Sequence, residues 1–284
     1  MKNRSTVAVL LFAFFAVAFV SVEAQTDLPL KRTAFKTDTL DFGPGGTLSV
    51  VGAPNGSIRI EGWSNNEVQV NAQIEMSART EAELDQIAKV TGFILEESMG
   101  RTGIVSLGTH DKNYLKRAIK KFPKELVGLP FRIDYVIKVP KYCDLQIDGG
   151  KGDLFIAGVD GTIKINFLDS NAKLDLVGGA VHATFGEGTV EVTVPTRSWR
   201  GRFADISLAS GTMKVNLPPS LNAEIDASIL RNGKIENNYA EMKPKSRRET
   251  FTEKLIAAKS GSGGVPLKFT VGDGNLNISQ IVKQ

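Results

Sequence analysis

Cysteine and histidine are nearly absent from this chain of 284 residues, which has one Cys and two His. Because Cys143 is the single cysteine, the chain has no intrachain disulfide. The sequence pairs no His with Cys143, so nothing indicates that its thiol is a catalytic nucleophile. His110 and His182 are far from each other and from Cys143 in the sequence, so they give no zinc-ligand spacing. The sequence therefore predicts no catalytic residue, no metal ligand and no cofactor site.

Charge of one sign and long apolar segments are also scarce. The 35 Lys and Arg residues barely outnumber the 31 Asp and Glu residues, giving a net charge of +4. Nucleic-acid binding usually needs a concentrated basic face, so we expect no nucleic-acid partner. The one long apolar run, Val7–Val20, is shorter than the ~20 residues that a bilayer requires.

This apolar run has the flanks of a secretory signal peptide. Lys2 and Arg4 precede it, and Val22-Glu23-Ala24 follows as a small-x-small cleavage pattern. We therefore expect residues 1–24 to be removed, leaving Gln25 as the first residue. The predicted location is outside the cytoplasm: the periplasm, the cell surface or the medium.

Glycine and alternating apolar residues dominate what remains. The recurring unit is Gly or another small residue, then a polar residue, then apolar residues at every second position. It occurs at Gly152–Ile156, Gly161–Ile165, Ala172–Leu176, Gly188–Val192, Gly211–Val215, Gly233–Ile235 and Gly274–Ile278. This alternation predicts strands, and glycine permits positive φ at the corners between them. The spacing, roughly ten or twenty residues, is typical of solenoids.

We therefore predict an all-β fold, a single-stranded parallel β-helix or solenoid in which stacked short strands bury a common core. The alternative is an antiparallel β-sandwich with short hairpins. After the signal peptide, residues 25–142 form an N-terminal β segment whose strands begin near Thr39, with helical insertions at about 80–91 and 110–126. Residues 143–284 form the β-repeat segment, which continues the same solenoid.

The second helical insertion is unusually basic. Leu115, Ile119, Phe122 and Leu126 follow helical spacing, and Pro123 would bend or end the helix. Cations occupy most of the remaining positions: Lys112, Lys116, Arg117, Lys120, Lys121 and Lys124. The helix either packs through its apolar face with a solvated cationic back, or rests on anionic lipid or acidic wall polymers.

Three further features of the sequence are candidate sites. The run Gly149–Asp153 resembles a calcium-binding nonapeptide, but its Asp comes one place early and no second copy follows. Trp63 and Trp199 are candidate sugar platforms or core residues. The repeat also carries outward-facing carboxylates beside lysines, a composition found in β-helical enzymes that cleave acidic polysaccharides: Asp148, Asp153, Asp169 and Asp175, with Lys151, Lys164 and Lys173. No pair has the spacing of a general acid and base.

The ordered series of units resembles a known family. Gly56–Ile60, Val139-Pro140 with Leu145–Ile147, Gly152–Ile156 and Gly161–Ile165 carry the resemblance, followed by Gly211–Pro218, Leu221–Ala223, Gly263-Gly264 and Gly272–Ile278. The chain is similar to the bacterial exported proteins called putative adhesins, with DUF4097-type β-strand repeats. The resemblance implies a β-helix-like fold and an envelope or surface location, and it implies no catalytic residues.

The leading functional hypothesis is a non-enzymatic envelope or secreted scaffold, with an adhesin-like surface for protein or polysaccharide. The alternatives are a polysaccharide-active lyase or hydrolase on the same fold, and an accessory sensor domain in envelope stress. An anionic membrane surface is a further partner that the basic 110–126 segment suggests.

Overall fold

The computed structural model describes residues 29–43, 45–98, 101–119, 121–195, 200–246, 248 and 250–281. The predicted signal peptide and Trp199 lie outside this part of the chain. The strands are β1 (Leu30–Asp41), β2 (Thr47–Val51), β3 (Ile58–Trp63), β4 (Glu67–Ala78), β5 (Gly92–Ser98), β6 (Arg101–Leu107), β7 (Phe131–Pro140), β8 (Asp144–Lys151), β9 (Leu154–Ala157), β10 (Thr162–Asp175), β11 (Gly178–Thr193), β12 (Arg200–Leu217), β13 (Ala223–Ile229), β14 (Ile235–Asn238), β15 (Lys243–Pro244), β16 (Leu255–Ser260) and β17 (Val265–Gln280). The helices are α1 (Glu81–Ala88) and α2 (Lys112–Ala118), and Lys124–Leu126 forms a 3₁₀ turn. The prediction of an all-β chain is confirmed.

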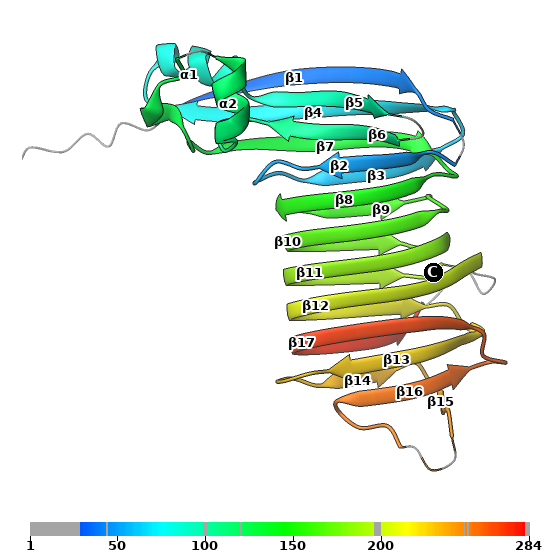
Figure 1. Ribbon diagram of the computed structural model, residues 1–284. Helices are drawn as coiled ribbons and strands as arrows, with labels where there is room; N and C mark the ends of the chain where they lie inside the picture. The colour runs from blue at the N-terminus through cyan, green and yellow to red at the C-terminus, as the bar shows by residue number, and fades with distance from the viewer. Residues whose placement is uncertain are drawn as a thin grey trace, which may run out of the picture.

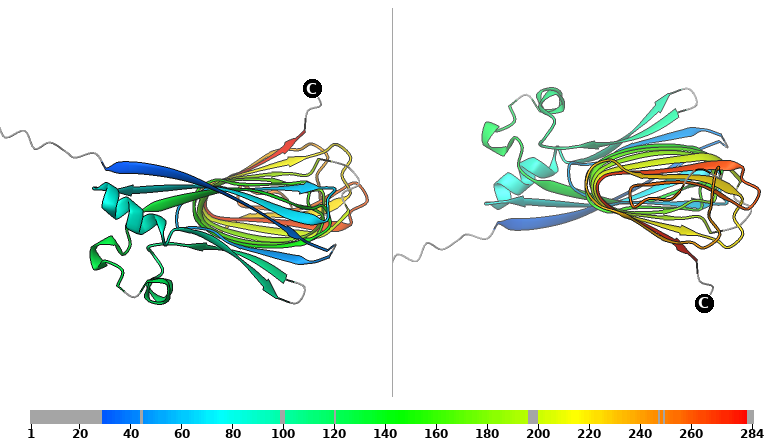
Figure 2. Two further views of the ribbon diagram at one scale, coloured as in Figure 1. Left: turned by 90° about the horizontal axis from the view of Figure 1, so that it is seen from above. Right: turned by 90° about the horizontal axis from the view of Figure 1, so that it is seen from below.

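The middle of the molecule is a stack of long, bent strands (Figure 1). β10 pairs in parallel with β11, β11 with β12, and β12 with β17. In β10 the buried positions are 163, 165 and 167 before the bend and 170, 172 and 174 after it. The switch from odd to even positions keeps apolar side chains on the inside of both halves. In the end views of Figure 2 the strands of the stack curve around a common interior.

The core consists of apolar columns that run along this stack. Ile147, Ile165 and Ala183 are register partners, and the column continues through Ile206 and Phe269. All five side chains are buried. No single strand could bury its apolar face alone, so stacking supplies the hydrophobic stabilisation.

A second column, of glycines, lies at the bend. Gly188, Gly211 and Gly274 are register partners in successive strands. Their φ angles are 118°, 134° and 130°, a conformation that side chains with Cβ rarely adopt. Positive φ at the corners, predicted from the sequence, is confirmed here.

The two ends of the molecule depart from the predicted parallel arrangement. β4 pairs antiparallel with β1 and β7, and β5 pairs antiparallel with β6. At the other end, β16 pairs antiparallel with β13 and β15. The fold is therefore a mixed sheet of seventeen strands over the described residues, with parallel pairing in its middle.

The order of the strands in the stack also differs from their order in the chain. The C-terminal strand β17 lies between β12 and β13, pairing in parallel with both. The Gly274 unit therefore separates the units of Gly211 and Gly233 (Figure 1). Sequence periodicity alone does not reveal such an exchange, because each unit presents the same pattern to either neighbour.

Both helices lie at the end of the stack that carries β1 (Figure 1). The predicted capping box is confirmed in α1: Thr80 Oγ1 accepts a hydrogen bond from the Glu83 amide, and the Glu83 carboxylate accepts one from the Thr80 amide. Arg32 of β1 forms ion pairs with Glu81 and Asp85 of α1, both at 2.7 Å. In the described part of the chain, no helix is long and apolar enough to cross a membrane.

Candidate functional site

The basic segment after β6 folds differently from its prediction. Asp111 caps α2, since its carboxylate accepts hydrogen bonds from the Asn113 and Tyr114 amides at 2.9 Å. These amides lower the pKa of Asp111, the Tyr114 bond most. The helix ends at Ala118 instead of continuing to residue 126, because Ile119 is extended, with φ −136° and ψ 121°.

The early end of α2 creates a hollow beside it, which we call the lysine-rimmed pocket. Its volume is 690 Å³, and it is lined by Lys112, Leu115, Lys116, Ile119, Lys121, Phe122, Lys124 and Val127. Leu115 is buried, and Ile119, Phe122 and Val127 are only half-buried. The prediction of one continuous apolar helix face is therefore wrong: only Leu115 lies on α2, while Ile119, Phe122 and Val127 lie beyond its end and remain partly uncovered.

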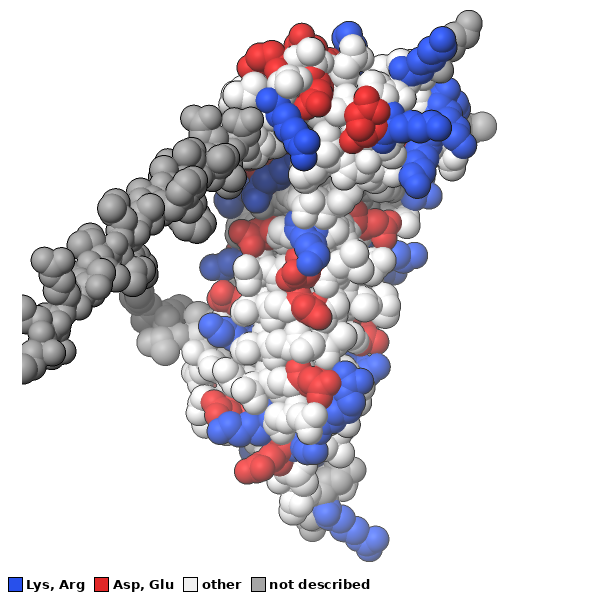
Figure 3. Space-filling model, turned by 90° about the vertical axis from the view of Figure 1, so that its left-hand side faces the viewer, with Lys and Arg blue, Asp and Glu red and all other residues white. Residues whose placement is uncertain are grey.

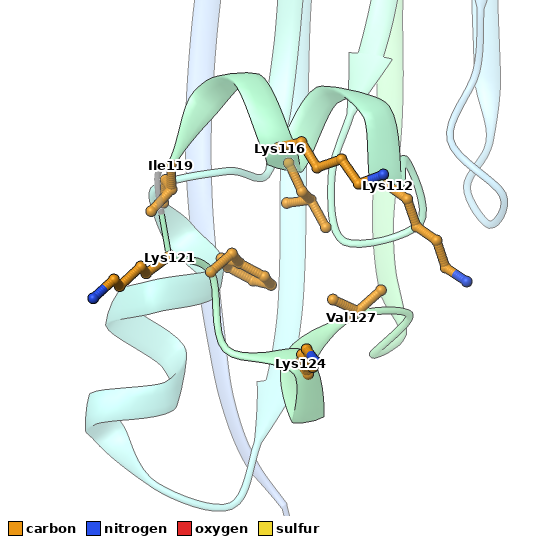
Figure 4. A pocket seen from close by; sticks show the side chains of 8 residues that line it. Lys112, Lys116, Ile119, Lys121, Lys124 and Val127 are labelled. Atoms are coloured by element: carbon orange, nitrogen blue, oxygen red, sulfur yellow. The ribbon is translucent and has the colours of Figure 1, made fainter.

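The lysines of this pocket stand at its margin. Lys112, Lys116, Lys121 and Lys124 are exposed, and Figure 4 shows their side chains spread around the apolar residues. No Asp or Glu occurs in the sequence between Asp111 and Glu125. Figure 3 shows Lys and Arg gathered on one side of the helical end, with Asp and Glu beside them, and cations and anions intermingled along the stack.

This arrangement suits a ligand with an apolar part and a negative charge. The half-buried side chains offer apolar surface, and the amines offer positive charge with hydrogen-bond donors. An amphiphile with an anionic headgroup meets both requirements.

Trp63 and Tyr142 form a smaller hollow of 430 Å³ with Asn65, Asn66 and Pro140. The Trp63 indole N–H donates to the Glu67 carbonyl at 2.9 Å, so its polar atom is already engaged. Lys138 Nζ lies 5.4 Å from the centre of the Trp63 ring system, a cation–π contact. Trp63 is thus held in place at a surface hollow, with a lysine near its ring.

The carboxylates of the repeat lie among cations and amides. Lys151 Nζ is 3.6 Å from Asp169 Oδ2 in the neighbouring strand. The Asn171 amide donates to Asp153 at 3.2 Å. These contacts join neighbouring levels of the stack. Lys151 and Asp169 also line a hollow of 470 Å³ with Glu187 and Arg231, so carboxylates and cations meet there at the surface of the stack.

The glycine run of the suspected calcium loop has packing reasons of its own. A Cβ on Gly149 would overlap the Phe167 ring, and a Cβ on Gly150 would overlap the Pro54 carbonyl. Gly152 has a φ of 147° at the bend. Among the described residues, no group of three or more Asp, Glu, His or Cys side chains could hold a metal ion.

The scarce reactive residues have structural surroundings. Cys143 is buried, and burial raises the pKa of its thiol to about 12, which keeps it protonated and unreactive. The centres of the His110 and Phe131 rings lie 5.3 Å apart. Burial lowers the pKa of His110. His182 is exposed on the outer face of β11, as its alternation predicts.

Sequence reasoning found the lysines of the lysine-rimmed pocket and its apolar residues Leu115, Ile119 and Phe122, but not Val127 or the pocket itself. The hollow depends on where α2 ends, and helical spacing gave no sign of that before Pro123. It also missed the first part of β1, which begins at Leu30 instead of near Thr39. A signal for this strand was present in the sequence. Thr33, Phe35, Thr37 and Thr39, all of residue types that favour strands, occupy every second position.

No family model and no curated protein match this chain. Its structure is similar to that of a putative cell adhesion protein from Clostridium sporogenes, with 14% sequence identity and a TM-score of 0.46; the match covers 88% of this chain and 100% of the other. A putative adhesin from Bacteroides fragilis has 12% identity and a TM-score of 0.31, covering 87% and 97%. A putative lipid binding protein from Parabacteroides distasonis has 10% identity and a TM-score of 0.28, covering 88% and 97%. These likenesses are distant, so the proposals below rest on this chain's own residues.

Proposed function

We propose that this chain is a non-enzymatic, exported envelope or secreted protein, a β-solenoid scaffold whose helical end binds an anionic membrane surface. The observation that carries the proposal is the lysine-rimmed pocket, which combines uncovered apolar side chains with four exposed lysines. The stack of parallel strands in the middle of the molecule, which we call the stem, separates this end from the opposite end of the molecule.

The solenoid interpretation is supported by the register of the middle strands. Thr162 pairs with Ala180 and Ser170 with Gly188, so both halves of β10 have the same offset of 18 residues to β11. A constant offset in both halves is expected when the chain makes one complete turn per strand. The column of positive-φ glycines marks the same corner in successive turns.

Export is supported by the signal-peptide pattern of residues 1–24. Peptide mapping of the protein from its native host should show a chain that begins at Gln25. An intact Met1 would contradict this part of the proposal without touching the membrane part.

Membrane binding follows from the charge and the apolar surface together. A basic residue close to an anionic bilayer contributes about 1 kcal/mol to binding at moderate salt. The apolar residues Ile119, Phe122 and Val127 can then enter the boundary between headgroups and acyl chains. An adhesin-like or scaffold role fits the long stem, which offers polar faces for protein or polysaccharide.

Co-sedimentation with vesicles tests the membrane part. Vesicles of phosphatidylglycerol and phosphatidylcholine should bind the protein at low salt, and vesicles of phosphatidylcholine alone should not. Lys116→Gln with Lys124→Gln removes two charges, so binding should weaken by about 2 kcal/mol, or roughly 30-fold. The matched control is Lys164→Gln with Lys173→Gln, which removes two charges from the stem and should leave binding unchanged.

Two results would contradict the proposal. One is the absence of binding to anionic vesicles by the wild-type protein. The other is an equal loss in the stem variant, which would show a response to net charge instead of to the pocket. Turnover of pectate or alginate by the purified protein would overturn its non-enzymatic character.

A further inference from the structure

The outer edge of β1 is a feature of the helical end that is separate from the pocket. Over the described residues, β1 pairs only with β4, so one side of a strand of twelve residues carries no ladder. β1 is the topmost strand in Figure 1 and crosses the end of the stack in Figure 2. Phe35, on this strand, is 77% exposed, more than any other large apolar side chain described.

The hydrogen bonds show which backbone groups of β1 face outward. The Phe42 amide donates to the Asn66 carbonyl, in the same register as the pairs of β1 with β4. Alternation along an antiparallel ladder then directs the even-numbered residues of β1 toward β4. The odd-numbered residues 31 to 41 therefore present their N–H and C=O groups to the free edge. Charged side chains protect such edges from unspecific pairing, and β1 carries Lys31, Arg32 and Lys36, so a pairing strand must place no like charges opposite them.

The sequence of β1 is self-complementary when two copies pair antiparallel. Hydrogen bonding requires odd residues to face odd residues, which limits the possible registers. With the two-fold axis at Phe35, the facing pairs are Leu30 with Leu40, Lys31 with Thr39, Arg32 with Asp38, Thr33 with Thr37, Ala34 with Lys36, and Phe35 with itself. No like charges face each other, and apolar residues meet at the centre and at both ends.

The neighbouring registers are less favourable. An axis at Lys36 places two lysines opposite each other, and an axis at Ala34 places Arg32 opposite Lys36. An axis at Thr37 avoids like charges but pairs a shorter part of the strand, because it begins at Thr33 instead of Leu30. The register at Phe35 is thus the longest one without a like-charge pair.

We propose that β1 pairs with β1 of a second copy of this chain, antiparallel about a two-fold axis at Phe35. The β4–β1 sheet then continues across the axis into the sheet of the second copy. This contact is isologous, so it closes at a dimer and leaves the free edge of neither copy exposed. The two stems point away from each other from a shared helical end.

Cross-linking tests the register. Phe35→Cys places two thiols opposite each other on the exposed face, about 5.5 Å apart at the Cα atoms, within reach of a short bis-maleimide. Thr37→Cys places them roughly 14 Å apart along the strands, at about 3.4 Å per residue, beyond that reagent. Leu168→Cys, an exposed site on the stem, reports random collisions, and the native Cys143 is buried. Phe35→Cys should link at least tenfold faster than both.

Mass measurement tests the pairing itself. Light scattering of the wild-type protein should show a dimer that dissociates on dilution. Thr33→Pro removes a free-edge N–H without touching the β4 ladder, so it should be a folded monomer by circular dichroism. Thr33→Val, which keeps that N–H, should remain a dimer.

Several results would overturn this inference. A wild-type monomer at every soluble concentration would do so, as would equal linking of Phe35→Cys and Leu168→Cys. Linking of Thr37→Cys as fast as Phe35→Cys would reject the register. A monomer whose odd-numbered β1 amides resist hydrogen exchange would show that another segment of the same chain covers the edge.

Discussion

The glycine column allows a stringent test of the stacked architecture, through the substitution Gly211→Ala. Gly211 has a φ of 134°, and a Cβ built there would lie less than 3.0 Å from the carbonyl oxygen of Gly188, closer than real Cβ atoms come. Backbone strain of this kind costs about 1–3 kcal/mol. Forcing a methyl group into a packed site costs about 1–3 kcal/mol more. We expect the free energy of unfolding to fall by ~4 kcal/mol.

Two other glycines separate these contributions. Gly128 has a φ of 83° but open space around its Cβ position, so Gly128→Ala should cost about 1 kcal/mol from backbone strain alone. Gly43 has neither a positive φ nor a close neighbour, so Gly43→Ala should change stability by less than about 0.5 kcal/mol. The series therefore isolates the effect of stacking on the neighbouring strand.

Urea unfolding followed by circular dichroism measures all three variants at one protein concentration. The loss in stability should be smallest for Gly43→Ala, larger for Gly128→Ala and largest for Gly211→Ala. A loss for Gly211→Ala no larger than that for Gly128→Ala would refute the close approach of the two strands at this corner.

Two further predictions concern buried polar groups. Ser170 occupies the glycine column, and its buried hydroxyl has no hydrogen-bond partner among the described residues. Ser170→Ala should therefore raise the free energy of unfolding by up to about 1 kcal/mol. A fall in the free energy of unfolding by the same amount would show that the hydroxyl has a hidden partner. The thiol of Cys143 should resist maleimide at neutral pH until the protein unfolds, because burial raises its pKa to about 12. Since the unfolded thiol loses its proton at lower pH than the folded one, this residue's contribution to stability is intact below pH 9.0 and declines as the pH rises toward 12. Rapid labelling of the folded protein would contradict the burial.

The local structure of much of the chain could be read from the sequence. The alternation in Gly161–Ile165 and Gly188–Val192 predicts strands that the structure contains, because a strand with one buried face needs an apolar residue at every second position. The capping box of Thr80 and Glu83 predicts the start of α1, because both of its hydrogen bonds lie within four residues. These features depend on near neighbours in the chain.

Features set by distant residues were missed. The antiparallel pairing at the ends and the place of β17 depend on contacts between strands far apart in sequence. The lysine-rimmed pocket exists because α2 ends at Ala118, before the predicted stop at Pro123. The free edge of β1 becomes visible only when its partners are known.

The sequence by itself determined the strands, the glycine corners, the basic segment and the scarcity of Cys and His. Each of these follows from residue chemistry over a short stretch of chain. The tertiary structure decided which strand stacks on which, where the apolar side chains stay uncovered, and which strand edge carries no partner. The physical reason is that every repeat unit presents the same apolar and hydrogen-bonding pattern, so its neighbours are chosen only when the whole core assembles.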